Sequence, residues 1–177
     1  GEYILQLAHE APSHIVAPVV HKSRDEVSDL FHAKHAKPRK TGIAELCREA
    51  RETLRPHFLS ADMGISGANF IIAETGSTLI VTNEGNGRMV TTLPRVHVAI
   101  TGIEKVVPTL EDATTLLRLL ARHGTGQSIT NYISVTTGVA QPGEMGPAHF
   151  HIILLDGGRT RLIGSDLQEM LRCIRCG

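Results

Sequence analysis

The spacing of apolar residues changes along the chain between the pattern of a buried strand and that of a helix. Two short apolar runs, at 70–73 and 78–82, are rich in β-branched residues and bounded by glycine and asparagine. This pattern predicts two buried strands joined by a tight turn. The nearly continuous apolar run at 96–101 predicts a strand of the kind buried in a parallel sheet. Further strands are expected at 132–137 and 149–155.

Helical spacing occurs before these strands. The sequence Ser23-Arg24-Asp25-Glu26 is a capping box, which predicts a helix over about 23–35. An apolar stripe from Ile43 to Leu54 predicts a second helix, in which Cys47 is a small core residue. Pro56 is expected to start a further turn rather than to extend that helix.

The second half of the chain has its own helix and loop signals. Thr109-Leu110-Glu111-Asp112 opens a helix that is expected to end at Gly124. The leucines expected to form its broad buried face are Leu116, Leu117, Leu119 and Leu120. The stretch at 83–87 is rich in Asn and Gly, which predicts an irregular loop. Ser165 to Gln168 is expected to cap a last helix that runs through Leu171.

Strands that alternate with helical segments predict an α/β sandwich with a mostly parallel sheet. A chain of 177 residues favours one domain. The 18 Lys and Arg residues balance 18 Asp and Glu residues, and there is no Trp. Neither the basic face nor the aromatic platform of a nucleic-acid-binding protein is therefore expected. No apolar run approaches the roughly 18 residues that a membrane-spanning helix needs.

The turn between the first two predicted strands carries the first candidate chemistry. Glu74, Thr75, Gly76 and Ser77 place a carboxylate, two hydroxyls and a glycine at a strand end. Ligands of α/β proteins bind at the carboxyl ends of strands, so Glu74 is a candidate catalytic residue and its three neighbours are candidate ligand contacts. The alternative is an ordinary hairpin turn with a solvated Glu74, which the spacing alone favours.

The loop after the second of these strands is another candidate site. Asn83, Glu84, Asn86 and Arg88 combine a carboxylate, two amides and a guanidinium within six residues. Arginine suits a carboxylate ligand because its guanidinium can donate two parallel hydrogen bonds. An ordinary exposed loop is the alternative interpretation.

Histidines and cysteines are the remaining candidates. His149 and His151 would share one face of a strand, but no third ligand completes a metal site, so structural roles are expected. His97 lies within an apolar strand and is expected to be a hydrogen-bonded core residue. Cys173 and Cys176 form a C-x-x-C pair, which taken alone is a redox pair, half of a metal site or chance.

The stretch GISGANFIIAETGSTLIVTNEGNGRMVTTLPRVHVAITGIEKVV is the start of a resemblance that covers essentially the whole chain. It continues through TGQSIT, GPAHFHIILLDGGR and the terminal RCIRCG. Together these motifs resemble the lactate utilisation protein B family, whose members are LUD-domain iron–sulfur subunits of bacterial lactate-utilisation complexes.

The resemblance implies a three-layer α/β/α sandwich like that of CoA transferases, ribose-phosphate isomerase and glucosamine-phosphate deaminase. It also implies that the chain is a piece of a longer protein and that the fold is incomplete at the N-terminus. Residues 1–172 would then be the C-terminal portion of a LUD domain, and 173–177 would begin a ferredoxin-type iron–sulfur motif. A truncated sheet exposes an apolar face, so self-association is expected.

The function that the resemblance implies is electron transfer within a cytoplasmic complex that oxidises L-lactate to pyruvate, with the other subunits as partners. Cys173 and Cys176 would be ligands of a [4Fe–4S] cluster in the full-length protein. A cluster needs four thiolates, so the isolated chain is expected to hold none and to be inactive. Two alternatives are acyl or CoA transfer with Glu74 as nucleophile, by analogy of fold, and a non-catalytic domain that binds a small carboxylate or docks a partner.

Overall fold

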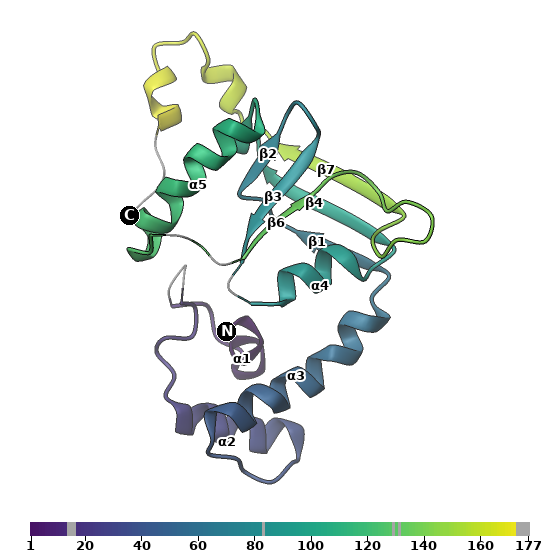
Figure 1. The fold of residues 1–177 in the computed structure, drawn as a ribbon. Helices are drawn as coiled ribbons and strands as arrows, with labels where there is room; N and C mark the ends of the chain where they lie inside the picture. The colour runs from purple at the N-terminus through teal and green to yellow at the C-terminus, as the bar shows by residue number, and fades with distance from the viewer. Residues whose placement is uncertain (14–16, 83, 129, 131, 173–177) are drawn as a thin grey trace. The chain divides into compact units, whose positions relative to one another are not determined.

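The computed structural model describes residues 1–13, 17–82, 84–128, 130 and 132–172. The chain divides into two compact units, residues 1–57 and 58–177, which are described in turn (Figure 1). The first unit is helical and the second contains all the described strands. None of the described helices combines the length and the apolar character needed to cross a bilayer.

The described part of the first unit contains α1 (Glu2–Ala8), α2 (Arg24–His35) and most of α3 (Ile43–Ser60), whose last three residues belong to the second unit. The capping box predicted at the start of α2 is confirmed. The Glu26 N–H donates to Ser23 Oγ over 3.3 Å, and the Ser23 N–H donates to Glu26 Oε2 over 2.8 Å. These two bonds satisfy backbone donors that a helix N-terminus otherwise leaves unpaired.

Helix α3 corrects two expectations. It continues through Pro56 instead of ending before it, because the fixed φ of proline is helical and the missing N–H removes only one bond close to the helix end. Cys47 is exposed rather than buried. The buried positions of α3 are Leu46 and Glu49, so the packed face is turned away from Cys47.

Three parallel strands form the first sheet of the second unit, β1 (Met63–Ser66), β4 (Val96–Gly102) and β7 (His149–Leu155). Their order is β1-β4-β7, and both pairings are parallel. The strands predicted at 96–101 and 149–155 are confirmed. Along β4, side chains alternate between fully buried and partly exposed, as expected of a strand whose two faces meet different surroundings.

Four strands form the second sheet in the order β5-β2-β3-β6. They are β2 (Phe70–Ile72), β3 (Ser77–Val81), β5 (Val106–Val107) and β6 (Ile133–Thr136). The antiparallel hairpin of β2 and β3 is the one predicted from the two β-branched runs. The α/β class is confirmed, with three parallel and two antiparallel strand pairs shared between two sheets.

Helix α5 (Leu110–Thr125) covers part of the second sheet. The capping box of Thr109 and Asp112 is confirmed, whereas the helix ends at Gly126, with φ of 70°, and not at Gly124. The buried cluster beneath it joins side chains of β2, β3, β5 and α5, namely Ile72, Leu79, Val107, Ala113 and Leu117.

The broad leucine face predicted for α5 is largely wrong. Leu117 is buried, but Leu116, Leu119 and Leu120 are exposed. The buried positions are Ala113, Leu117 and Ala121, which follow one another every four residues. The other leucines lie to one side of this narrow stripe.

Helix α4 (Asn86–Thr92) replaces part of the predicted loop at 83–87. The Met89 N–H donates to Gly85 O over 3.1 Å, so Asn86 and Gly87 already belong to the first helical turn. Helix α4 packs on β1 at Gly64, where a Cβ atom would lie 2.0 Å from Val90 O. Only glycine allows this approach of helix and strand.

Short 3₁₀ turns complete the second unit. They are η1 (Ile103–Lys105), η2 (Arg159–Leu162) and η3 (Gln168–Arg172). The last helix predicted from Ser165 is therefore the 3₁₀ turn η3. Its entry is fixed by the Gln168 side chain, whose Oε1 accepts the Gly164 N–H over 2.7 Å.

Candidate functional site

Glu74 lies at the carboxyl end of β2, next to the end of the parallel strand β5. The Glu74 N–H donates to Pro108 O over 3.1 Å, which continues the pairing of the two strands. Its carboxylate Oε1 accepts the N–H of Leu110, the first residue of α5, over 2.9 Å. The partial positive charge of a helix N-terminus favours an ionised carboxylate there. Glu74 is exposed, so its carboxylate is both fixed and accessible.

The neighbours of Glu74 form a chain of hydroxyls. Thr75 Oγ1 lies 2.6 Å from Ser77 Oγ, which lies 2.6 Å from Thr137 Oγ1. Ser77 is buried, whereas Thr75 and Thr137 are exposed. Gly76 has φ of 65°, which the turn requires and which glycine adopts without strain. The structure thus brings the predicted residues of this turn together and adds Thr137, which sequence reasoning missed because it is 60 residues from Ser77.

The second predicted group lies around the start of α4. The Arg88 guanidinium carbon lies 5.0 Å from the centre of the Tyr132 ring, within the range of a cation–π contact. Asn86 Oδ1 accepts the Gly87 N–H over 2.8 Å, and Glu84 is exposed. Asn83 lies outside the described residues. Tyr132, just before β6, was not predicted as part of this group.

The two groups lie at opposite ends of β3. Ser77 begins this strand, and the second group follows its last residue, Val81. The first and last Cα atoms of this strand lie about 13 Å apart, since each of the four steps between them adds about 3.3 Å. A ligand of a few heavy atoms can touch one group or the other, but not both.

His97 is a core residue, as predicted. Its side chain is fully buried, its Nε2 lies 2.8 Å from Ser66 Oγ, and its ring centre lies 5.2 Å from that of Phe150. Burial lowers the pKa of His97, because the charged imidazolium loses its hydration. Its Nδ1 has no hydrogen-bond partner among the described residues.

His149 and His151 are exposed on β7, where they pair with Val96 and Val98 of β4. Among the described residues, no three His, Cys, Asp or Glu side chains come together as metal ligands would. Cys173 and Cys176 lie outside the described residues. The chain has three cysteines in all, so its thiols alone do not fit the four-thiolate set of a [4Fe–4S] cluster.

A buried ionic network in the first unit was not predicted. Tyr3 Oη lies 2.6 Å from His35 Nε2, and His35 Nδ1 lies 2.8 Å from Glu49 Oε1. Lys40 Nζ lies 2.9 Å from Glu49 Oε2. Burial raises the pKa of Glu49, but the hydrogen bonds from His35 and Lys40 outweigh it and leave that pKa lowered.

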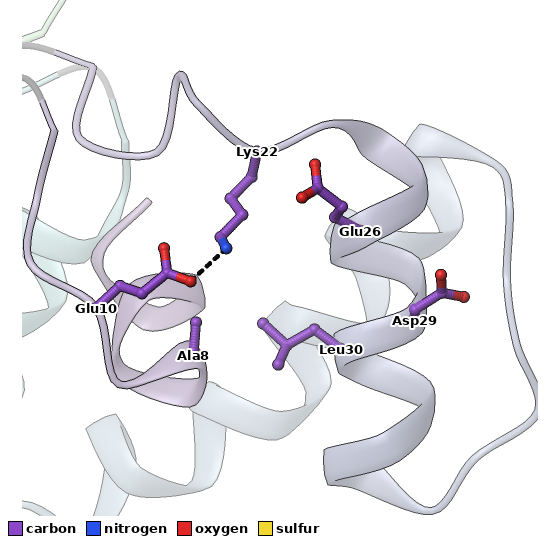
Figure 2. Close-up of a pocket in the computed structure, with 6 residues that line it drawn as sticks. All are labelled: Ala8, Glu10, Lys22, Glu26, Asp29 and Leu30. Carbon is purple, nitrogen blue, oxygen red and sulfur yellow. Dashed lines mark hydrogen bonds and ion pairs between the residues drawn. The ribbon is translucent and has the colours of Figure 1, made fainter.

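A pocket of about 350 Å³ opens between α1 and α2 (Figure 2). Its lining consists of Ala8, Glu10, Lys22, Glu26, Asp29 and Leu30. Lys22 Nζ contacts Glu10 Oε1. The hydrogen bonds of Lys22 and His21 to the Glu10 carboxylate lower the pKa of Glu10. Three carboxylates face one ammonium in this pocket, a balance that disfavours an anionic ligand.

Comparison with known proteins gives three findings. The family model of the LUD domain matches residues 1–155. Proteins named Lactate utilization protein B from Geobacillus thermodenitrificans and Lysinibacillus sphaericus are 46% and 47% identical to the chain over 178 residues. Each match covers 99% of this chain and 37% of the relative, so the chain spans little more than a third of their length.

The crystal structure of a DUF162 family protein from Deinococcus radiodurans is also similar. It aligns with a TM-score of 0.44 and 20% sequence identity, and the alignment covers 56% of each chain.

Proposed function

This chain belongs to the LUD-domain family, and we propose that it is the LUD portion of a protein that serves the utilisation of lactate. The observation that carries this proposal is the identity of 46–47%, over 99% of the chain, to relatives named Lactate utilization protein B. An identity of this size, over an alignment that includes nearly every residue of the chain, is far above the level at which only a fold is shared.

The proposed role is that of an iron–sulfur electron-transfer subunit in a cytoplasmic complex that oxidises L-lactate to pyruvate. This oxidation releases two electrons and two protons, and iron–sulfur clusters accept electrons without forming bonds to the substrate. Cys173 and Cys176 are proposed as two cluster ligands, and the remaining thiolates would come from other parts of the complete protein. The other subunits of the complex are the proposed partners.

Arg88 is the group best suited to hold the carboxylate of a small ligand such as lactate. Its guanidinium can donate two parallel hydrogen bonds while the Tyr132 ring supports its other side. Asn86 lies two residues away and adds an amide donor. Glu74, near the opposite end of β3, is proposed as a separate contact for a ligand or a reacting group, held in place by the N-terminus of α5.

A chimera tests the proposed function. In the Geobacillus thermodenitrificans protein, the matched 178-residue segment is replaced by this chain, and the chimera is expressed in a strain that lacks its own copy of that protein. We expect growth on L-lactate to return, with the unaltered Geobacillus protein as positive control and growth on glucose as the measure of general fitness. Normal growth on glucose without growth on L-lactate, at equal protein levels, would contradict the proposal.

Variants of the chimera test the role of Arg88. Arg88→Gln removes the guanidinium from the proposed carboxylate contact, and growth on L-lactate is expected to slow most at low lactate concentration. Arg118→Gln makes the same change at an exposed position of α5 and serves as the matched control. Equal growth of the two variants at every lactate concentration would remove Arg88 from the proposed site.

A further inference from the structure

Ser66 and His97 form a hydrogen-bonded pair at the end of a parallel strand. Ser66 is the last residue of β1, and His97 lies on the neighbouring strand β4 (Figure 1). Gly64 pairs with His97 and Ser66 pairs with Ala99, so the two side chains project from the same face of the sheet. Ser66 Oγ lies 2.8 Å from His97 Nε2. Such a pair is either a nucleophile with its base or a hydroxyl that the imidazole holds in place.

The surroundings of His97 decide which ring nitrogen carries the proton. The ring is fully buried, and burial lowers the pKa of His97, so the imidazole is neutral at neutral pH. A neutral ring has one N–H and one acceptor nitrogen. Nδ1 has no hydrogen-bond partner among the described residues. A buried N–H without an acceptor is rarer in proteins than an unused acceptor, so the proton belongs on Nε2, which donates it to Ser66 Oγ.

This direction of the bond makes Ser66 a donor and not a nucleophile. Its oxygen accepts from His97, so its own O–H is left to donate elsewhere, and the bond to His97 is the one that Ser66 Oγ makes within the described part of the chain. A base would have to become a buried imidazolium. None of the described carboxylates is bonded to Nδ1, where it could stabilise that charge.

The space beside the Ser66 hydroxyl is accessible. Ser66 is partly exposed and Gly67 is exposed. A Cβ atom at Gly67 would meet Ile100 O at 3.9 Å, an ordinary contact distance. The Thr101 hydroxyl donates to Ala68 O over 3.0 Å, which fixes the backbone just after Ser66. A fixed hydroxyl therefore lies at the carboxyl end of a parallel strand, where ligands of α/β proteins bind.

The lack of charged residues in the strands around Ser66 indicates the class of ligand. The segments 63–69, 96–102 and 149–155, which include the three parallel strands, contain no Asp, Glu, Lys or Arg. A charged oxygen bound to Ser66 would lose hydration without gaining a counter-ion from these strands. An uncharged carbonyl oxygen needs one hydrogen-bond donor, which Ser66 supplies. A keto, aldehyde or ester carbonyl is therefore the group that fits.

We propose that Ser66 binds the carbonyl oxygen of a small ligand and that His97 positions the Ser66 hydroxyl for this contact. His97 is a positioning residue, since it touches Ser66 and not the ligand. The proposal accounts for an imidazole at a buried position of an otherwise apolar strand, where a leucine would pack but would not orient a hydroxyl. It concerns a contact other than those proposed for Arg88 and Glu74, and it does not depend on a role in lactate utilisation.

NMR of the 177-residue chain with isotope-labelled histidine nitrogens tests the position of the proton. Protonated and unprotonated ring nitrogens give well-separated signals. The signals of His97 are assigned through their contact with the Phe150 ring, whose centre lies 5.2 Å from that of His97. We expect the proton on Nε2 at neutral pH, and we expect the Nε2 signal to shift on titration with methyl pyruvate, an uncharged keto compound. The complete chimera replaces the chain if the chain alone does not fold.

Variants at residue 66 test the carbonyl contact. Ser66→Ala removes the hydroxyl and is expected to weaken the binding of methyl pyruvate at least tenfold, because the carbonyl oxygen loses its donor. Ser66→Thr keeps a hydroxyl and is expected to retain binding. Ser134→Ala makes the same change at a partly exposed serine of β6, in the other sheet, and is the matched control.

Three results would overturn the proposal. A proton on Nδ1 would make Nε2 an acceptor, as in a base. Covalent labelling of Ser66 by a fluorophosphonate, read by mass spectrometry of the peptide that carries residue 66, would make Ser66 a nucleophile. Equal binding by Ser66→Ala, or no shift with methyl pyruvate, would mean that the hydroxyl meets only solvent. The tautomer is read on the unaltered protein, so a variant that does not fold leaves that result standing. L-Lactate enters none of these measurements, so their outcome is separate from that of the growth test.

Discussion

Glu74 shows how one side chain combines a local turn with a long-range contact. Its place after β2 was predicted, and its ligand role remains a hypothesis. The bond from Leu110, 36 residues later, was not predicted, because nothing in the hairpin sequence specifies which helix N-terminus will approach it. The contact fixes the carboxylate at the carboxyl ends of two parallel strands, where ligands of α/β proteins bind.

Glu74→Gln in the chimera is expected to lower the rate of lactate oxidation at least tenfold, which corresponds to about 1.4 kcal/mol of transition-state stabilisation. The free energy of unfolding is expected to change by less than about 1 kcal/mol, since glutamine keeps an oxygen that can accept the Leu110 N–H. Glu111→Gln, in the first turn of α5, is the matched control. A lower melting temperature with unchanged turnover would make Glu74 a purely structural residue.

His97 is expected to make the second unit sensitive to mild acid. Burial lowers the pKa of His97 below its ordinary value of about 6.5, so the unfolded chain binds a proton more readily than the folded one. The contribution of neutral His97 to the free energy of unfolding is therefore fully present above that value. It is lost progressively as the pH drops from about 7 to 5. Urea unfolding followed by tyrosine fluorescence in a Tyr3→Phe background, which leaves Tyr132 as the reporter, measures this dependence.

His97→Leu removes the titrating group, and the stability of this variant is expected to be flatter between pH 7 and 5. His149→Gln, which alters an exposed histidine, should keep the full dependence. A steep pH dependence that survives in His97→Leu would assign the effect to another group.

At the scale of elements, local signals predicted the starts of α2 and α5 and the hairpin, and missed what depends on the packed face. The capping boxes of α2 and α5 each lie within four residues, so the sequence alone specifies them. Burial of Cys47 and of the α5 leucines depends on which neighbours cover each helix, and that is set by distant residues. The network of Tyr3, His35 and Glu49 spans 46 residues and leaves no local pattern.

Gly64→Ala is expected to destabilise the contact of β1 with α4 by about 1–3 kcal/mol or more, because a Cβ would overlap the Val90 carbonyl and overpacking costs energies of this size. Gly85→Ala is the matched control, since φ there is −75° and no atom lies within 4 Å of its Cβ position. Its effect on stability is expected to be smaller than that of Gly64→Ala, because Gly85 is an N-cap that makes no side-chain hydrogen bond and its Cβ would meet open space. Thermal unfolding of both variants compares them, and equal melting temperatures would contradict the packing of α4 on β1.

Glu49→Gln is expected to destabilise the helical first unit by about 1–3 kcal/mol, because the donors of His35 and Lys40 lose a buried carboxylate. The pKa of Glu49 is lowered in the folded chain, so its contribution is present above the unfolded value of about 4.3 and is lost as the pH falls through the folded value. Glu49→Gln should lose this acid-dependent step. Glu52→Gln, exposed on the same helix, should keep it.

Tyrosine fluorescence in a Tyr132→Phe background reports on the first unit, because Tyr3 is then the remaining tyrosine and the chain has no Trp. Identical acid transitions in the Glu49 and Glu52 variants would show that the buried network does not control the stability of this unit.

At the scale of the whole molecule, the alternation of strands and helices was sufficient to predict the α/β class. The division of the strands into two sheets was not predicted, because pairing such as β1 with β4 joins residues more than 30 positions apart. The resemblance added what periodicity could not, namely the family, and the match over residues 1–155 confirms it. The cluster ligands and the partner subunits stay predictions.

The iron content of the chain is a prediction at this scale. Three cysteines cannot supply four thiolates, so the isolated chain purified without oxygen is expected to contain no stoichiometric iron. The chimera, purified in the same way, is expected to contain it. Stoichiometric iron in the isolated chain would show that other residues complete a site.

The central claim, electron transfer from lactate, is tested most directly by the visible absorbance of the chimera under anaerobic conditions. On addition of L-lactate, the iron–sulfur absorbance is expected to bleach in the presence of the partner subunits and to stay unchanged without them. An absorbance that L-lactate leaves unchanged in the assembled complex, while dithionite bleaches it fully, would contradict the proposed role.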